Sequence, residues 1–165
     1  MQHVLTTDRL ELRPVAAADL ADLLAHWTDP DVRRFLFDGE VLTAERVAGA
    51  IADSERDPVC GLWLVRERAT GALAGTAGLR PLEDVGVEVT YSLSPPFWGY
   101  GYATEAARAV VEHALGPAGL PEVLAEVDEG NTASIAVVER LGMTPFETVP
   151  GLLGPMIRYR RIANG

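Results

Sequence analysis

The chain has 165 residues, which suits one domain and leaves little room for two. Hydrophobic residues make up 48% of it, which is enough to form a folded core and argues against wholesale disorder. A net charge of −10 argues against a nucleic-acid-binding protein, which would normally carry a basic face. All fourteen basic residues are arginine, which excludes both a Schiff-base lysine and the lysine of a phosphate-binding P-loop.

Cysteine and histidine are sparse. Cys60 is the only cysteine, so an intrachain disulfide and a cysteine-based metal cluster are excluded. His3, His26 and His113 are scattered without ligand spacing, and we predict no metal site. The sequence has neither the pattern of a signal peptide nor a stretch long and apolar enough to span a membrane. We therefore expect a cytoplasmic protein that binds neither nucleic acid nor membranes.

The first half of the chain alternates between strand and helix patterns. A short strand is expected over 10–15, ended by Pro14. Apolar residues at i, i+3, i+4 and i+7 predict a helix over 20–27, and the following Pro30 disfavours helix at Asp29. A second helix is expected to begin at Thr43, an N-cap candidate. Three further strands are predicted over 61–68, 72–80 and 86–94, of which the first two form a hairpin.

The second half continues the mixed pattern. Composition and periodicity predict a helix over 103–115, a strand over 122–129 and a short helix from Asn131 that ends at Gly142, with two weak strands near 144–149 and 156–162. No linker divides the chain. The prediction is a single mixed α/β domain spanning residues 1–165.

The segment WGYGYAT, residues 98–104, places two glycines directly before the helix over 103–115. A helix N terminus carries unpaired backbone N–H groups and a partial positive charge, so it can bind a pyrophosphate without a lysine. Gly99 and Gly101 would let such a ligand approach the main chain. A plain strand-to-helix turn explains the same glycines equally well. A dinucleotide fingerprint is excluded, because its third glycine is replaced by Thr104 and several strands precede the loop.

Three segments together resemble the GCN5-related N-acetyltransferase (GNAT) superfamily, and more closely its RimJ/RimL-like branch. LTTDRLELRP is similar to the opening strand of that branch, and SLSPPFWGYGYATEA resembles its acetyl-CoA pyrophosphate loop. EGNTASIAVVERLGM resembles its asparagine-x-x-serine helix. Trp98 is usual in this branch, although the wider superfamily has glutamine or arginine there. Tyr100 stands where a basic residue is common, so weaker coenzyme affinity is expected.

The resemblance implies a mostly antiparallel sheet that splays open between the strands over 86–94 and 122–128, with helices on its flanks. The pantetheine arm of acetyl-CoA would lie in that gap, against backbone groups of Tyr91 and Leu93. Ser134 is the candidate hydrogen-bond donor to the departing thiolate, and capping of a helix is its alternative role. The residues expected to bind the coenzyme are Tyr91, Leu93, Trp98, Gly99, Tyr100, Gly101, Tyr102, Ala103, Thr104, Asn131 and Ser134.

The implied reaction is transfer of an acetyl group from acetyl-CoA to a primary amine, by direct attack in a ternary complex. Glu88 and Glu126 compete as the general base that deprotonates the amine, and either could instead be an ordinary hydrogen-bonded sheet residue. The acceptor is a protein N terminus or a small-molecule amine, selected by the first two helices and the segment 144–165. A catalytically silent acyl-CoA sensor is the alternative function. The family also makes a homodimer plausible.

Overall fold

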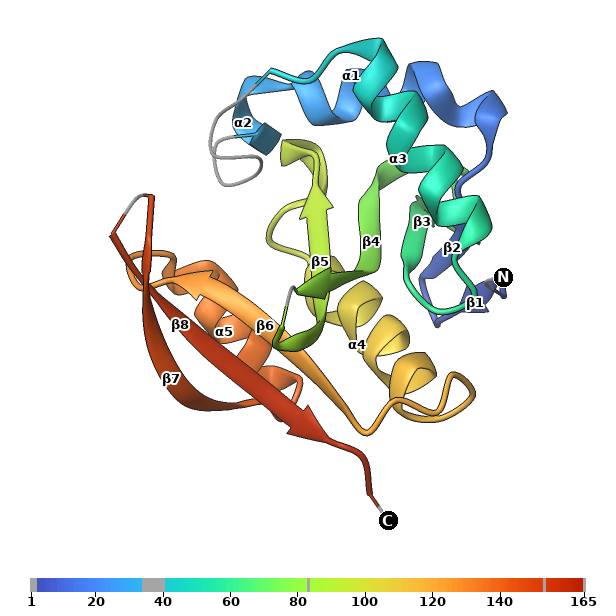
Figure 1. The fold of residues 1–165 in the computed structure, drawn as a ribbon. Coiled ribbons are helices and arrows are strands. Elements are labelled where there is room, and N and C mark those ends of the chain that lie inside the picture. The colour runs from blue at the N-terminus through green and yellow to red at the C-terminus, as the bar shows by residue number, and fades with distance from the viewer. Residues whose placement is uncertain (1–2, 34–40, 83, 153, 165) are drawn as a thin grey trace.

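The strands form one open, twisted sheet. The structure is a computed structural model that describes residues 3–33, 41–82, 84–152 and 154–164. Eight strands follow in the order β1-β2-β3-β4-β5-β6-β8-β7 (Figure 1). Within these residues only the β5–β6 pair is parallel, so the predicted mostly antiparallel mixed α/β fold is confirmed. The strands are β1 (Leu5–Thr6), β2 (Leu10–Pro14), β3 (Gly61–Glu67), β4 (Leu73–Leu82), β5 (Gly86–Leu93), β6 (Glu122–Asp128), β7 (Thr144–Gly151) and β8 (Gly154–Ile162).

The helices lie close to their predicted positions. They are α1 (Leu20–Thr28), α2 (Pro30–Arg33), α3 (Ala44–Arg56), α4 (Tyr102–Leu115) and α5 (Thr132–Arg140), with short 3₁₀ turns η1 (Ala17–Asp19) and η3 (Pro95–Phe97). Thr43 is the N-cap of α3, because its hydroxyl accepts the Arg46 backbone N–H at 3.2 Å. Gly142 follows α5 with φ of 77°, as predicted for a left-handed end.

Two short elements escaped the sequence analysis. Asp29 leaves the helix with ψ of 125°, as expected before a proline, but Pro30 then begins the extra helix α2. Proline suits a first helical position because its missing N–H is not needed there. The two-residue strand β1 forms only by pairing with β2, and such a short pairing leaves no periodic signal in the sequence. Val15, expected in the first strand, lies just beyond its end.

Apolar side chains on the two faces of the sheet build two separate cores. Along β3, Trp63 and Val65 belong to the larger cluster on one face, whereas Leu64 belongs to a smaller cluster on the other. This alternation follows from the two-residue period of a strand. The smaller cluster is closed by α1 and α3, and the larger one by α4 and α5 (Figure 1).

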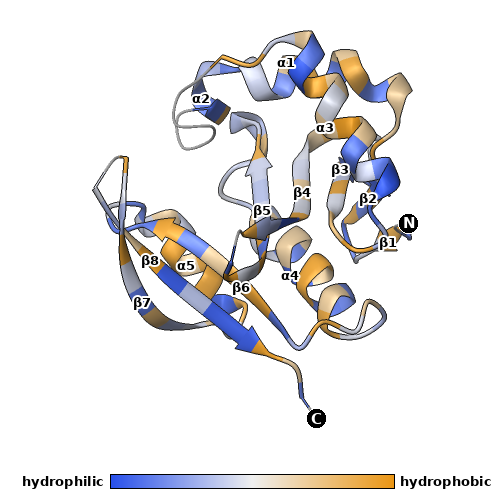
Figure 2. Ribbon diagram, in the orientation of Figure 1, coloured by the Kyte–Doolittle hydropathy of each residue, from blue (hydrophilic) through white to orange (hydrophobic). Residues whose placement is uncertain are grey.

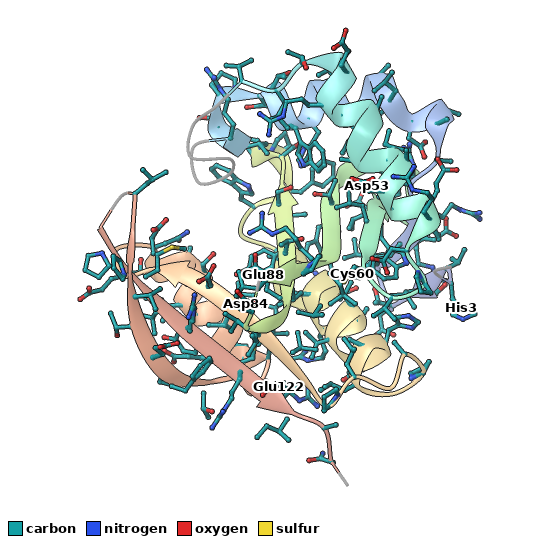
Figure 3. All side chains as sticks on the ribbon, viewed as in Figure 1. His3, Asp53, Cys60, Asp84, Glu88 and Glu122 are labelled. Atoms are coloured by element: carbon teal, nitrogen blue, oxygen red, sulfur yellow. The ribbon has the colours of Figure 1, made fainter. Side chains whose placement is uncertain are left out.

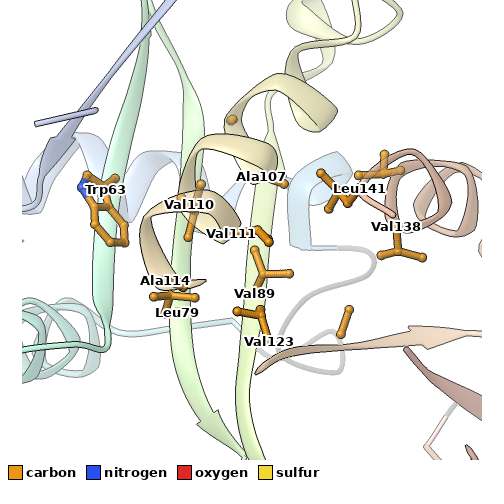
Figure 4. Packing of buried hydrophobic residues seen from close by; sticks show 14 of the residues in the cluster. Trp63, Leu79, Val89, Ala107, Val110, Val111, Ala114, Val123, Val138 and Leu141 are labelled. Carbon is orange, nitrogen blue, oxygen red and sulfur yellow. The ribbon is translucent and has the colours of Figure 1, made fainter. Parts of the chain in front are cut away.

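Small side chains let α4 lie close to the sheet. Ala106, Ala107, Val110, Val111 and Ala114 form one buried stripe at spacings of three and four residues. Figure 4 shows this stripe over Leu79 and Val89 of the neighbouring strands. Figure 2 shows that α4 carries much hydrophobic colour, whereas hydrophilic colour dominates along β8. Helix α4 is therefore the main packing partner of the central strands, and its N terminus is held firmly at the end of β5.

The sheet opens between β5 and β6. These two strands pair at a single position, Glu88 with Leu124, whereas β4 and β5 pair along their whole length. Beyond that pair the two strands diverge (Figure 1). This is the splayed sheet that the family resemblance implies. No helix among the described residues is both long and apolar enough to cross a membrane; the cytoplasmic location stays a prediction.

The close approach of β4 and β5 generates a stability prediction. A Cβ atom at Gly75 would overlap the carbonyl oxygen of Ser92. Gly75→Ala should therefore push the two strands apart and lower the free energy of unfolding by about 1–3 kcal/mol. Urea denaturation measures the change.

Gly49 on α3 is the matched control for Gly75. No atom of the described residues lies within 4 Å of a Cβ built there, and Gly49 is exposed in a helix. Gly49→Ala should raise stability by about 0.5–1 kcal/mol, because alanine favours helix. A Gly75→Ala protein as stable as the wild type would show that the strands accommodate a methyl group.

Candidate active site

The two loop glycines adopt the backbone conformation that only glycine enters freely. Gly99 has φ of 83° and Gly101 has φ of 79°, and Gly101 is the N-cap of α4. Because Gly101 has no side chain, the first backbone N–H groups of α4 stay open to a ligand. Tyr100, between the glycines, is exposed to solvent, and its ring lies 5.8 Å from the ring of Tyr102. The loop thus has the shape that a pyrophosphate site requires.

The odd-numbered residues of β5 turn their backbone groups toward the gap. The Ser94 N–H bonds the Ala74 carbonyl at 2.9 Å, and antiparallel ladders alternate from residue to residue. The backbone N–H and C=O groups of Ser92 and Ser94 therefore face β4. Those of Tyr91 and Leu93 face the side from which β6 has diverged. The Leu93 carbonyl accepts the indole N–H of Trp98 at 2.8 Å, which fixes the loop to the end of β5. The sequence analysis did not identify this bond.

The side chain of Tyr102 lies between the loop and β3, and Glu105 anchors the first turn of α4. The Tyr102 hydroxyl donates to Glu67 at 2.7 Å, and the Arg9 guanidinium lies 4.5 Å from the centre of its ring. Glu105 accepts from the Thr7 hydroxyl at 2.5 Å and from Nε of Arg9 at 2.7 Å. These contacts outweigh burial and lower the pKa of Glu105. Glu105 therefore fastens the start of α4 to the segment before β2.

Ala103 and Thr104 lie in the first turn of α4. A groove of about 740 Å³ runs between this helix and the β1–β2 segment, and it includes Gly101 and Thr104. The groove gives access to one side of the α4 N terminus. Thr104 itself is 8% exposed, and Ala103 packs partly against the larger core. Their contact with coenzyme phosphates stays a prediction.

A pair of hydroxyl groups bridges β5 and α5. The Tyr91 hydroxyl donates to Oγ of Ser134 at 3.0 Å. Burial raises the pKa of Tyr91, so the phenol remains protonated and can donate. Because Ser134 accepts from Tyr91, its own proton is available for another acceptor. The sequence analysis assigned only the backbone of Tyr91; nothing in a single sequence connects its hydroxyl with a residue 43 positions later.

Asn131 occupies the N-cap of α5. Its side-chain oxygen accepts the Ser134 backbone N–H at 3.2 Å. Asn131 therefore caps the helix that was expected to begin at this residue. It also orients Ser134, whose hydroxyl points to Tyr91. Contact of Asn131 with a coenzyme stays a prediction.

The two candidate bases meet where the sheet divides. Figure 3 places Glu88 near the centre of the molecule. Its carboxylate is 3% exposed, binds Nε of Arg80 at 2.8 Å and accepts a hydrogen bond from the Glu126 backbone. The Glu126 carboxylate binds Nε of Arg158 at 2.9 Å. Burial raises the pKa of Glu88, and the charge of Arg80 opposes this rise.

Across the described parts of the chain, no group of three or more histidine, cysteine, aspartate or glutamate side chains could hold a metal ion.

Comparison with known proteins agrees with this geometry. Residues 9–144 match the acetyltransferase (GNAT) domain family. The "Uncharacterized protein YkkB" of Bacillus subtilis is 31% identical over 95% of this chain and 94% of its own length. The "FsC-acetyl coenzyme A-N(2)-transacetylase" of Aspergillus fumigatus is 30% identical over 96% of this chain and 75% of its own length.

A solved structure shares the fold. The ribosomal L7/L12 alpha-N-protein acetyltransferase RimL, in complex with coenzyme A, superposes with a TM-score of 0.81 at 16% identity, covering 97% of this chain and 98% of that one. The splayed sheet, the glycine turn and the sequence matches have one explanation in common. The chain belongs to the GNAT family and is an acetyltransferase.

The burial of Glu88 generates a pH prediction. A carboxyl group whose pKa is higher in the folded state than its ordinary 4.5 binds protons more readily when folded. The stability of the wild type relative to Glu88→Gln, which does not titrate, should therefore be greatest below pH 4.5 and fall as pH rises. Melting temperatures of both proteins from pH 4 to pH 8 measure the difference.

Arg80→Gln is the companion variant for the pH prediction. This variant removes the charge that opposes the rise in the pKa of Glu88. The fall in stability with increasing pH should therefore become steeper. If instead the wild type gains stability over Glu88→Gln with increasing pH, the ion pair with Arg80 dominates and the prediction is wrong.

Proposed function

We propose that this chain transfers the acetyl group of acetyl-CoA to a primary amine within one catalytic domain. The observation that carries the proposal is the pair of left-handed glycines, Gly99 and Gly101, at the N terminus of α4 beside the open edge of β5. The glycine turn suits the pyrophosphate, and the gap between β5 and β6 suits the extended pantetheine arm. The match to the GNAT family supports the same coenzyme.

The chemistry follows from the groups around the gap. When the amine nitrogen attacks the acetyl carbonyl carbon, negative charge develops on the carbonyl oxygen. A backbone N–H of β5 facing the gap can stabilise that charge, an effect of about 3 kcal/mol in other enzymes. As the C–S bond breaks, the Ser134 hydroxyl donates to the sulfur and the Tyr91 hydroxyl supports it.

Glu88 is the base that we favour over Glu126. A base works best when its pKa is near the working pH, and burial moves the pKa of Glu88 in that direction. Glu126 is held by Arg158, which also binds Glu147 at 2.9 Å. Both carboxylates lie at the division of the sheet, so a water molecule could connect either one with the amine.

The acceptor is a protein N terminus or a small amine. The RimL structure, an alpha-N-protein acetyltransferase, supports a protein N terminus as the acceptor. The Aspergillus enzyme is by its name an N(2)-transacetylase, and its sequence is more similar to this chain than that of RimL is. Helices α1 and α3 and the segment 144–165 should select it, although residues 153 and 165 lie outside the described part. The RimJ/RimL-like branch and a homodimer stay part of the proposal.

Coenzyme binding is the first test. Gly101→Glu adds a side chain and a negative charge to the turn, so it should abolish acetyl-CoA binding measured by calorimetric titration. Gly119→Glu is the matched control, because Gly119 has φ of 72° and open space around it, beyond the C terminus of α4 and so at the opposite end of that helix from the loop. The control should bind like the wild type. No binding by the wild type would refute the proposed function.

Turnover is the second test. Release of free thiol from acetyl-CoA would be followed with spermidine and, separately, with a short peptide that has a free α-amino group. Ser134→Ala should keep coenzyme binding and lower kcat about 100-fold. Glu88→Gln should remove the acidic limb of the pH–rate profile, whereas Glu126→Gln should retain it. Binding without turnover on either acceptor would favour the silent acyl-CoA sensor, and the reverse result for the two glutamates would make Glu126 the base.

A further inference from the structure

A histidine is buried between α1 and the end of β5. His26 is 5% exposed, and both of its ring nitrogens have hydroxyl partners. Nε2 lies 2.9 Å from Oγ of Ser92, and Nδ1 lies 3.0 Å from Oγ of Ser94. The Ser92 hydroxyl extends the hydrogen-bond network to Oγ1 of Thr76 at 2.7 Å. Four polar side chains from α1, β4, β5 and the turn after β5 thus satisfy one another.

The imidazole of His26 is neutral near pH 7. Burial lowers the pKa of His26, and the contact with Ser92 and the charge of Asp29 oppose this only in part. A neutral ring donates from one nitrogen and accepts at the other, while each hydroxyl can do both. The hydrogen bonds of this network therefore all run in one direction, and each of the four side chains has a partner. Such a fully satisfied buried network favours one arrangement over its near alternatives.

Ser92 and Ser94 flank Leu93, whose backbone groups face the gap between β5 and β6. Leu93 lies between Ser92 and Ser94, and its carbonyl accepts the indole N–H of Trp98. The Ser94 carbonyl accepts the Phe97 N–H at 2.9 Å, which starts the turn η3. Any rotation at Ser94 would therefore move η3, and with it the glycine turn that follows.

Apolar packing also holds α1 in place. Leu23 and Trp27 of α1 are buried against Val47 and Ile51 of α3 in the smaller core. An apolar residue at position 26 would add to that packing without the cost of burying polar groups. The network with His26 instead determines where the last residues of β5 lie.

We propose that His26 is a positioning residue for coenzyme binding, which acts through Ser94 to align the Leu93 backbone and the Gly99–Gly101 turn. This inference rests on the proposed function. It concerns a residue that makes no contact with the coenzyme itself and lies outside the motifs that resemble the family.

Two variants separate positioning from stability. An asparagine side chain can place its amide where Nδ1 lies and keep the bond to Ser94, whereas glutamine can reach the place of Nε2 and keep the bond to Ser92. Both His26→Asn and His26→Gln should lower the melting temperature. Only His26→Gln should raise the Kd for acetyl-CoA, by about tenfold, the effect of losing one buried hydrogen bond. Ser94→Ala should reproduce that rise.

Thr76→Val is the control at the other end of the network. It removes the bond to Ser92 but leaves His26 and Ser94 together, so it should lower stability and leave the Kd unchanged. Equal Kd values for the wild type, His26→Gln and Ser94→Ala would overturn the inference, as would a Kd that rises in Thr76→Val along with the loss of stability. If the wild type itself binds no acetyl-CoA, the proposed function fails first.

Discussion

The structure depends on the divergence of β5 and β6 after one parallel pair. Glu88 pairs with Leu124, and beyond this point the strands no longer share hydrogen bonds. A sheet normally avoids such a division, because unpaired backbone groups inside a protein cost free energy. Here the Glu88 carboxylate takes up the Glu126 backbone N–H, and Arg80 compensates its charge. One backbone N–H at the division is thus satisfied by a side chain, while the strands remain open on the side of Tyr91 and Leu93.

The elements around the division supply different parts of one site. Helix α4 brings a positive N terminus with two left-handed glycines, and α5 brings Ser134, oriented by its own N-cap Asn131. The larger core holds both helices against the sheet, so the site stands on packed elements and not on long loops. The hydroxyl of Tyr91 then connects β5 with α5 across the opening. Figure 1 shows α4 and α5 on the same face, on either side of the division.

Much of the fold could be predicted from local patterns. The strand over 61–68 and the helix over 20–27 follow from periodicities of 2 and 3.6, because each element buries one face. Thr43 and Gly142 could be recognised as helix boundaries, since capping depends on neighbouring residues. The helix α2 and the strand β1 could not, because each is too short to show a period. Of the site, the glycine turn and Ser134 were found as candidates from motifs alone.

The sequence by itself determined the order of the longer elements, the helix N-caps Thr43 and Asn131, and the family. These depend on residues close together in the chain, whose conformational preferences act locally. Only the tertiary structure decided which distant side chains meet: Tyr91 with Ser134, Glu88 with Arg80 and the Glu126 backbone, and His26 with Ser92 and Ser94. Those contacts arise from the register of strands and the seating of helices. Register and seating are settled by the packing of the whole core, and no local pattern encodes them.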